Sequence, residues 1–243
     1  MSIEKLKQMI EQSDNIVFFG GAGVSTESGI PDFRSENGIY SAMSEYGYPP
    51  ETILSHSFFV KRPDVFFQYY KKNLLYPDAE PNFAHKALAQ LEKQGKLKAV
   101  ITQNIDDLHQ KAGSKNVLEL HGTLYRNYCL KCGRTFDLDY VIKEPGITKC
   151  DKCGGVVRPD VVLYEEGLDQ NVLYQAVQFI SEADVLIVGG TSLAVYPAAG
   201  LINYYKGNQL VLINKSTTGY DKKADLIIRE NIGEVFQNIM GIK

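Results

Sequence analysis

The chain has 243 residues, 44% of them hydrophobic and 23% charged, which is the composition of an ordinary globular protein with one large domain or two modest ones. Its formal net charge of −3 gives no basic face for nucleic acid, and no apolar run approaches the length of a membrane span. No signal peptide is visible, so we expect a cytoplasmic protein, in which disulfides are disfavoured and the four cysteines need another role.

Apolar residues at helical spacing mark several segments. Near the N-terminus, Ile3, Leu6 and Ile10 recur on one face, with Ser2 as a candidate cap. Further helical patterns with one apolar face cover residues 82–94, 171–180 and 232–239.

Short continuous apolar runs lie between these helices, and each ends in glycine or a polar residue. Such runs are typical of strands in a parallel sheet that is covered on both faces. Because the runs alternate with helices, the sequence predicts a doubly wound α/β fold. The predicted strands cover residues 15–19, 97–101, 117–120, 184–188 and 209–213.

Two stretches interrupt this alternation. Residues 36–79 are rich in aromatic residues and proline, and we expect a helical insertion there. Residues 123–159 hold every cysteine and form a second insertion, predicted to be a zinc-binding module. The main domain is then assembled from residues 1–35, 80–122 and 160–243.

The cysteines form two pairs, Cys129-x-x-Cys132 and Cys150-x-x-Cys153, separated by residues 133–149. A two-residue gap lets both sulfurs of a pair reach one tetrahedral metal, and this separation falls in the range of four-cysteine zinc sites. Four thiolates leave no open coordination position, so we predict one structural Zn²⁺ rather than a catalytic one. Two disulfides or four unrelated thiols are the alternatives.

Glycine turns follow two of the predicted strands. Gly21-x-Gly23 comes before a predicted helix, where backbone amides can approach a pyrophosphate. Thr26 stands where a dehydrogenase fingerprint has its third glycine, and the acid that would hold the ribose is missing. The second turn, at residues 189–192, adds hydroxyl groups. Each turn alone is explained as well by a tight strand-to-helix connection.

Several residues lie just beyond the carboxyl ends of predicted strands, the edge at which open α/β sheets bind ligands. His121 closes one run, and its near-neutral pKa suits a general base, although a lone histidine is more often structural. Asn104 and Asp106 follow another run and are equally suited to capping a helix. His56, His85 and His109 are interpreted as structural. The residues at this edge are Gly21, Asn104, His121, Ser192 and Asn214.

The segment Gly29-Ile30-Pro31-Asp32-Phe33-Arg34 is a third polar cluster. It is either a surface turn or a loop that closes over a ligand. In the second case Arg34 is placed to bind a phosphate through two parallel hydrogen bonds.

These motifs together resemble those of the sirtuins, the NAD-dependent protein lysine deacylases, and the bacterial-type deacetylases in particular. The resemblance covers nearly the whole chain and keeps the family's order. It rests on residues 21–25 with 29–34, 102–106, 120–122, the two cysteine pairs, 190–193 and 213–214.

The resemblance implies a large Rossmann-like NAD-binding domain and a smaller domain made of the helical insertion and the zinc module. NAD and an acetylated protein or peptide would meet between them. His121 would be the general base, and His121, Asn104 and Asp106 are the candidate catalytic residues. The implied NAD contacts are Ala22, Thr26, Phe33, Arg34, Gln103, Asn104, Ile105, Asp106, His121, Thr191, Ser192, Asn214 and Ile232.

The segment 161–168 would pair with an extended substrate peptide, adding it as a strand. Val162 and Tyr164 would line an apolar tunnel for the lysine side chain. Many relatives read Phe-Gly-Glu where this chain has residues 164–166. The implied peptide contacts are Val162, Tyr164, Glu165, Glu166 and Gly167.

The implied activity transfers the acetyl group of acetyl-lysine to ADP-ribose and releases nicotinamide and O-acetyl-ADP-ribose. Sirtuins that remove succinyl groups resemble one another in a Tyr-x-x-Arg pair, for which the nearest match here is Tyr69-x-x-Lys72, so we expect an uncharged acyl group. The alternatives are a sirtuin-like mono-ADP-ribosyltransferase, a deacylase of a longer acyl chain, and a non-catalytic NAD sensor. No direct partner among nucleic acids or membranes is expected.

Overall fold

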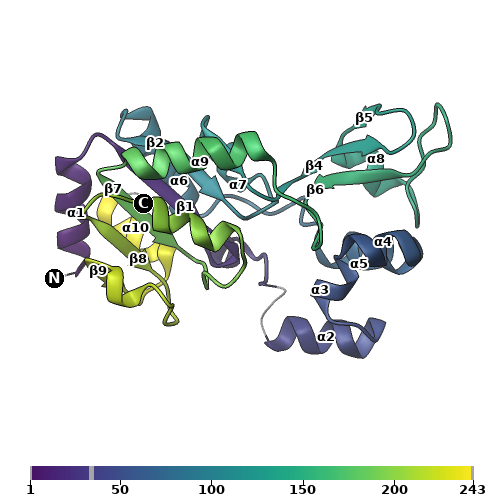
Figure 1. The fold of residues 1–243 in the computed structure, drawn as a ribbon, viewed down its shortest axis with the longest axis horizontal. Coiled ribbons are helices and arrows are strands. Elements are labelled where there is room, and N and C mark those ends of the chain that lie inside the picture. Colours follow the sequence, from purple (N-terminus) through teal and green to yellow (C-terminus); the bar gives the residue numbers. More distant parts are fainter. Residues whose placement is uncertain (1, 33–35, 242–243) are drawn as a thin grey trace.

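The computed structural model describes residues 2–32 and 36–241, in which the strands form two separate sheets (Figure 1). The larger sheet is parallel, with strand order β3-β2-β1-β7-β8-β9. Its strands are β1 (Ile16–Gly20), β2 (Leu97–Thr102), β3 (Val117–Glu119), β7 (Val185–Gly189), β8 (Leu210–Ile213) and β9 (Leu226–Ile228).

Helices cover both faces of this sheet, which explains why its central strands are apolar along their whole length. One face packs against α1 (Ser2–Gln12), α6 (Phe83–Lys93) and α10 (Ile232–Met240). The other packs against α9 (Gln170–Glu182) and the 3₁₀ helix η3 (Ala198–Tyr204). Every residue of β1, β7 and β8 is buried. The doubly wound α/β prediction is confirmed.

The order of the strands locates the ligand-binding edge. From β1 the chain runs outward through β2 and β3, then returns to the other side of β1 as β7 and continues through β8 to β9. The connections after β1 and β7 therefore leave in opposite directions, which opens a crevice at their carboxyl ends. Both strands end in glycine there, with Gly20 paired in register with Gly189.

The observed elements differ from the predicted ones mainly at their ends. The first strand begins at Ile16 and extends into Gly20, and Ser2 is the first residue of α1 rather than the residue before it. The sequence did not indicate β9, because three residues are too short to show a period. Among the described residues, none of the helices is long and apolar enough to cross a membrane.

The smaller sheet is antiparallel, with order β5-β4-β6, and carries the cysteines. Its strands are β4 (Gly122–Cys129), β5 (Thr135–Phe136) and β6 (Val157–Val161), with α8 (Leu138–Lys143) beside them. The segment 36–79 is helical as predicted. It contains α2 (Glu36–Tyr46), α3 (Pro50–Ile53), α4 (His56–Lys61) and α5 (Pro63–Asn73).

One hydrophobic cluster joins these helices to the small sheet. Phe59, Phe66 and Tyr70 from the helices pack with Leu124 of β4 and Val157 of β6. Each fully buried side chain of this size contributes roughly 1.5–3 kcal/mol. Because neither insertion could bury its apolar side chains alone, the two form one smaller lobe beside the large sheet (Figure 1).

Two buried histidines lie against the large sheet. His85 on α6 and His109 on α7 (Leu108–Lys111) place their rings 4.7 Å apart, and His109 also lies near Phe18. The amide of Asn82 donates to Nδ1 of His85 at the start of α6 (3.3 Å). Burial lowers the pKa of His85 from 6.5 to about 3, and burial together with His85 lowers the pKa of His109 well below its ordinary value. Both rings are therefore neutral in the folded protein at neutral pH.

This buried pair predicts acid lability. Below about pH 6.5, and for His85 down to about pH 3, these histidines bind protons in the unfolded chain but not in the folded one. The pair therefore does not affect the free energy of unfolding above pH 6.5, and lowers it progressively as the pH falls. Each neutral histidine contributes a slope of about 1.4 kcal/mol per pH unit in this window. We expect His109→Phe to make the decline shallower by about one proton, measured by urea unfolding at several pH values. An unchanged slope would contradict this assignment.

Candidate functional site

Two glycine turns meet where β1 and β7 end. The amide of Gly21 donates to the carbonyl of Gly189 (3.3 Å), and the amide of Gly23 donates to that of Gly190 (2.8 Å). A Cβ atom at Gly23 would lie 2.8 Å from the Cα of Gly190, closer than side chains tolerate. The two backbones therefore touch directly, and only glycine permits this approach. The contact brings the amides of both turns to one edge of the sheet.

A chain of hydrogen bonds connects the side chains that follow β2, β7 and β8. Nε2 of Gln103 donates to Oγ1 of Thr191 (3.0 Å), and the amide of Thr191 donates to Oδ1 of Asn214 (2.9 Å). Nδ2 of Asn214 is buried and has no partner among the described residues. An unsatisfied buried donor costs about 1–3 kcal/mol, so this edge suits a ligand with acceptor oxygens, such as a nucleotide.

Ser25 connects two of the predicted catalytic residues. Its Oγ donates to Oδ2 of Asp106 (2.6 Å) and accepts from Nδ2 of Asn104 (3.0 Å). The amide of Leu108 donates to Oδ1 of Asp106 (3.0 Å), so Asp106 satisfies the first amide of α7 from the position before the N-cap, Asp107. Burial raises the pKa of Asp106, while the bonds from Ser25 and Leu108 oppose that rise. Ser25 therefore fixes the orientation of both side chains.

His121 lies between β3 and β4, where the chain passes from the large sheet to the small one. Its Nδ1 is 3.0 Å from the carbonyl oxygen of Gln103. A carbonyl can only accept, so in the neutral ring Nδ1 carries the proton and Nε2 the lone pair. The amide of Val162 donates to the carbonyl of His121 (3.0 Å), which places this histidine beside the segment 161–168.

A cavity of about 230 Å³ brings the residues of these networks together. Its wall includes residues from the first glycine turn, from the segment after β2, and from the segment after β6. The predicted site residues that line it are Ala22, Gln103, Asn104, Ile105, Asp106, His121, Val162, Tyr164, Glu165 and Glu166.

The remaining predicted residues lie elsewhere. Thr191 and Asn214 are connected to the cavity through Gln103. Ile232 packs against the end of β7, where a Cβ at Gly189 would lie 2.3 Å from its Cδ1. Thr26, Ser192 and Gly167 are exposed and do not line the cavity. Phe33 and Arg34 lie outside the described residues.

Sequence analysis did not identify the part of the cavity formed by α5. Phe66, Tyr70 and Asn73 line it from one face of this helix. Tyr69 instead packs edge-on against Tyr46, with ring centroids 5.3 Å apart, and Lys72 forms an ion pair with Glu45 (2.6 Å). The Tyr69-x-x-Lys72 pair therefore lies outside the cavity wall. Tyr69 is buried like Phe66 and Tyr70, so the apolar pattern of this helix does not show which face lines the cavity.

The four cysteines converge at the end of the small sheet where β4 terminates in Cys129. Their Sγ atoms lie within 4.8 Å of one another, with Cys129 and Cys153 at 3.5 Å and Cys132 and Cys150 at 3.8 Å. Tetrahedral zinc with Zn–S bonds of about 2.3 Å places its sulfurs about 3.8 Å apart, whereas a disulfide needs about 2.0 Å. The geometry fits one structural Zn²⁺ with four thiolate ligands, and the disulfide alternative is wrong.

Backbone turns support each cysteine pair in the same way. The amide of Gly133 donates to the carbonyl of Cys129 (2.9 Å), and the amide of Gly154 donates to that of Cys150 (2.8 Å). Both glycines have positive φ, 69° and 68°, a conformation that costs other residues energy. The two turns bring the sulfurs of each pair together.

The chain is similar to known proteins over most of its length. The model of the Sir2 family matches residues 21–197. A protein of Clostridium acetobutylicum named NAD-dependent protein deacetylase is 62% identical over 239 residues, which cover 98% of each chain. A protein of Staphylococcus aureus with the same name is 46% identical over 238 residues, again covering 98% of each chain.

Solved structures give the same result. A structure described as Sir2 with a p53 peptide and NAD⁺ superposes with a TM-score of 0.87 at 36% identity, covering 99% of this chain and 98% of that one. Another, described as Sir2 with the inhibitor EX-527, 2′-O-acetyl-ADP-ribose and deacetylated p53 peptide, has a TM-score of 0.85 at 37% identity and covers 98% and 97%.

The zinc geometry generates a prediction. Cys129→Ser should abolish stoichiometric zinc binding and destabilise the protein by about 4–5 kcal/mol, which lowers Tm by about 10–15 °C. Elemental analysis and calorimetry measure both effects, and Lys131→Ala serves as a control in the same turn. A full zinc complement with an unchanged melt in the Cys129 variant would refute the site.

Proposed function

This chain belongs to the Sir2 family, and from that premise we propose how its cavity carries out NAD-dependent protein deacetylation. The enzyme moves the acetyl group of an acetyl-lysine side chain to ADP-ribose and releases nicotinamide. One observation carries the mechanism: His121, with its proton on Nδ1, shares a single cavity with Asn104, Asp106 and the segment after β6.

In this proposal NAD binds at the edge of the large sheet where β1 and β7 end. The close backbone contact of the glycine turns and the unsatisfied donor of Asn214 fit its phosphate and ribose oxygens. Bound NAD supplies an electrophilic ribose carbon and a hydroxyl that receives the acetyl group. The proposed contacts are Ala22, Thr26, Phe33, Arg34, Gln103, Asn104, Ile105, Asp106, His121, Thr191, Ser192, Asn214 and Ile232.

His121 acts as the general base. Nε2 takes the proton of a ribose hydroxyl, and the carbonyl of Gln103 stabilises the resulting imidazolium through Nδ1. Asn104, oriented by Ser25, hydrogen-bonds the same ribose. Asp106 holds the nicotinamide end, with its carboxyl oriented by Ser25 and the amide of Leu108. Fixed polar groups of this kind are in place before the reaction begins.

The peptide binds along the segment 161–168 by adding a strand, which directs its lysine side chain into the cavity. Val162 and Tyr164 form the apolar wall of that passage and exclude water, which would otherwise hydrolyse NAD. We propose Val162, Tyr164, Glu165, Glu166 and Gly167 as the residues of the peptide side.

The cavity favours an uncharged acyl group. Among the described residues, no lysine or arginine lines it. Burial raises the pKa of Tyr70, so this phenol stays neutral, and Asn73 beside it is uncharged. A succinyl carboxylate would lie unpaired in this part of the cavity, which costs several kcal/mol. Acetyl is therefore the proposed substrate group.

The proposed division into domains follows the two sheets, except that Gly122 of β4 and residues 160–161 of β6 are assigned to the NAD-binding side. Residues 1–35, 80–122 and 160–243 form the NAD-binding domain, and 36–79 with 123–159 form the smaller one, which the shared hydrophobic cluster supports. Because acetyl moves to ADP-ribose, the enzyme is a transferase in this proposal, and because one water is consumed when the amide is cleaved to free lysine, it is also a hydrolase. We propose a cytoplasmic location, since four zinc-binding thiolates must stay reduced.

The mechanism predicts the behaviour of His121→Ala. Loss of the general base should lower kcat by about 10²–10⁴-fold while NAD binding, measured by calorimetry, is retained. Mass spectrometry of an acetyl-lysine peptide incubated with wild-type protein and NAD should detect the free lysine peptide and O-acetyl-ADP-ribose. Unchanged turnover in the variant would contradict the role of His121. Formation of ADP-ribosylated protein without O-acetyl-ADP-ribose by the wild-type protein would instead identify a mono-ADP-ribosyltransferase.

A further inference from the structure

The turn formed by residues 163–166 contains a glutamate in an unusual backbone conformation. Glu165 has a φ of 76°, in the left-handed region that glycine adopts freely and other residues adopt at a cost of about 1–2 kcal/mol. The turn lines the cavity on the peptide side. A residue in a strained conformation is kept there by contacts with its surroundings. The side-chain contacts of Glu165 identify them.

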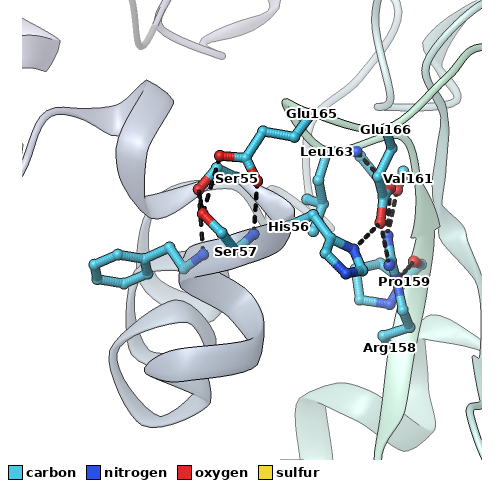
Figure 2. A network of polar contacts seen from close by, with 10 residues as sticks. Ser55, His56, Ser57, Arg158, Pro159, Val161, Leu163, Glu165 and Glu166 are labelled. Atoms are coloured by element: carbon cyan, nitrogen blue, oxygen red, sulfur yellow. Dashed lines mark hydrogen bonds and ion pairs between the residues drawn. The ribbon is translucent and has the colours of Figure 1, made fainter.

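The carboxylate of Glu165 is bound to the start of α4. Oε2 accepts from the amide of Ser57 (2.8 Å), and Oε1 accepts from its Oγ (2.9 Å) (Figure 2). The residues lie 108 positions apart in the sequence. These hydrogen bonds lower the pKa of Glu165, so the carboxylate stays ionised at neutral pH. The contact also satisfies an amide of the first helical turn that has no partner within the helix.

Backbone bonds reinforce the same contact. The amide of His56 donates to the carbonyl of Tyr164 (2.9 Å), and the amide of Tyr164 donates to the carbonyl of Leu54 (3.0 Å). Ser55 and Tyr164 are thus paired as in a parallel sheet. The segment 54–57 of the helical insertion therefore lies beside the 163–166 turn, which belongs to the proposed peptide-binding segment.

Glu166, the next residue, binds the turn to β6. Its carboxylate accepts two bonds from the buried guanidinium of Arg158 on β6 (2.7 and 3.1 Å) and one from the amide of Leu163 (2.9 Å). Nδ1 of His56 is 2.9 Å from the same group. Burial opposes its ionisation, but these partners outweigh burial and lower the pKa of Glu166 to about 2. Figure 2 shows Glu165 directed toward Ser57 of α4, and Glu166 between Arg158 of β6 and His56 of α4.

The Glu165 contact joins two neighbouring segments that both belong to the wall of the cavity. Leu54, Phe66 and Tyr70 line it from the helical insertion, and the neighbouring segment 161–166 lines it from the end of β6 onward. Glu166 holds the turn to β6 and also contacts His56 of α4, whereas, among the described residues, Glu165 bonds only the helical insertion, through Ser57. A change in the Glu165 contact therefore alters the passage that receives the lysine side chain, without touching the NAD edge at the glycine turns.

We propose that Glu165 is a positioning residue for the acylated peptide, acting through Ser57 to hold the helical insertion against the 163–166 turn. This inference rests on the proposed deacetylase function. Glu165 is accordingly assigned to aligning the peptide strand rather than to binding the peptide through its own carboxylate, which Ser57 already engages.

The test uses Glu165→Gly in the full-length protein. Glycine adopts a φ of 76° without strain, so the variant removes the carboxylate and leaves the turn. We expect the Kd of a fluorescein-labelled acetyl-lysine peptide, measured by anisotropy, and its KM in turnover to rise roughly tenfold, as for loss of charge-assisted hydrogen bonds. The kcat and the KM for NAD should stay within about twofold, and the Tm should change little.

Partner and control variants separate positioning from general stability. Ser57→Ala should raise the peptide Kd less than Glu165→Gly does, and combining the two should add nothing beyond Glu165→Gly alone. Glu45→Gln, which breaks the ion pair with Lys72 in the same insertion, should leave peptide affinity unchanged. An unchanged peptide Kd in Glu165→Gly, or additive effects in the double variant, would overturn the proposal.

The anisotropy experiment keeps the two proposals apart. If wild-type protein turns over NAD and peptide but Glu165→Gly binds peptide normally, only the positioning role fails. If wild-type protein binds the peptide without forming O-acetyl-ADP-ribose, the deacetylase function fails, while a weaker peptide affinity in Glu165→Gly still supports the positioning role.

Discussion

The direct contact between two glycine turns is the constraint on which the site depends. Gly23 donates to Gly190 across the end of the sheet, and a Cβ at either position would collide with the other backbone. Because β1 and β7 are neighbours, this contact forms where the chain connections diverge. Gln103 and Thr191 are then close enough to hydrogen-bond, and His121 is oriented through the carbonyl of Gln103. The proposed general base is thus positioned by the same edge that receives the nucleotide.

The smaller lobe contributes the other wall of the cavity and depends on two different stabilising features. Four cysteines organise one end of the small sheet, and a shared hydrophobic cluster holds the helical insertion to its face. The cysteines do not line the cavity, whereas Phe66 and Tyr70 of the cluster do. Together the two features hold α5 and the 163–166 turn in the cavity wall, where Glu165 bonds Ser57 of α4 and Glu166 bonds Arg158 of β6.

Charge is distributed unevenly in this site, with consequences for chemistry. Buried Asp106 has a raised pKa, whereas Glu166, with a guanidinium and an amide as partners, has a pKa near 2. The part of the cavity lined by Tyr70 and Asn73, proposed to receive the acyl group, is neutral, because Lys72 is paired with Glu45 outside it and Tyr70 stays protonated. The site therefore combines polar groups at the nucleotide end with an apolar passage for the substrate side chain.

The local pattern of residue types in the sequence determined the central strands and the zinc site of this protein. Continuous apolar runs predicted the central strands, because a strand buried on both faces must be apolar throughout, and cysteine spacing predicted the zinc site, because a two-residue gap suits one tetrahedral ion. Tertiary structure alone decided that Tyr70 and Asn73 line the cavity in place of Tyr69 and Lys72, and that Glu165 bonds Ser57. Those outcomes depend on which helix face meets the small sheet and on contacts between residues distant in sequence, which no local period encodes.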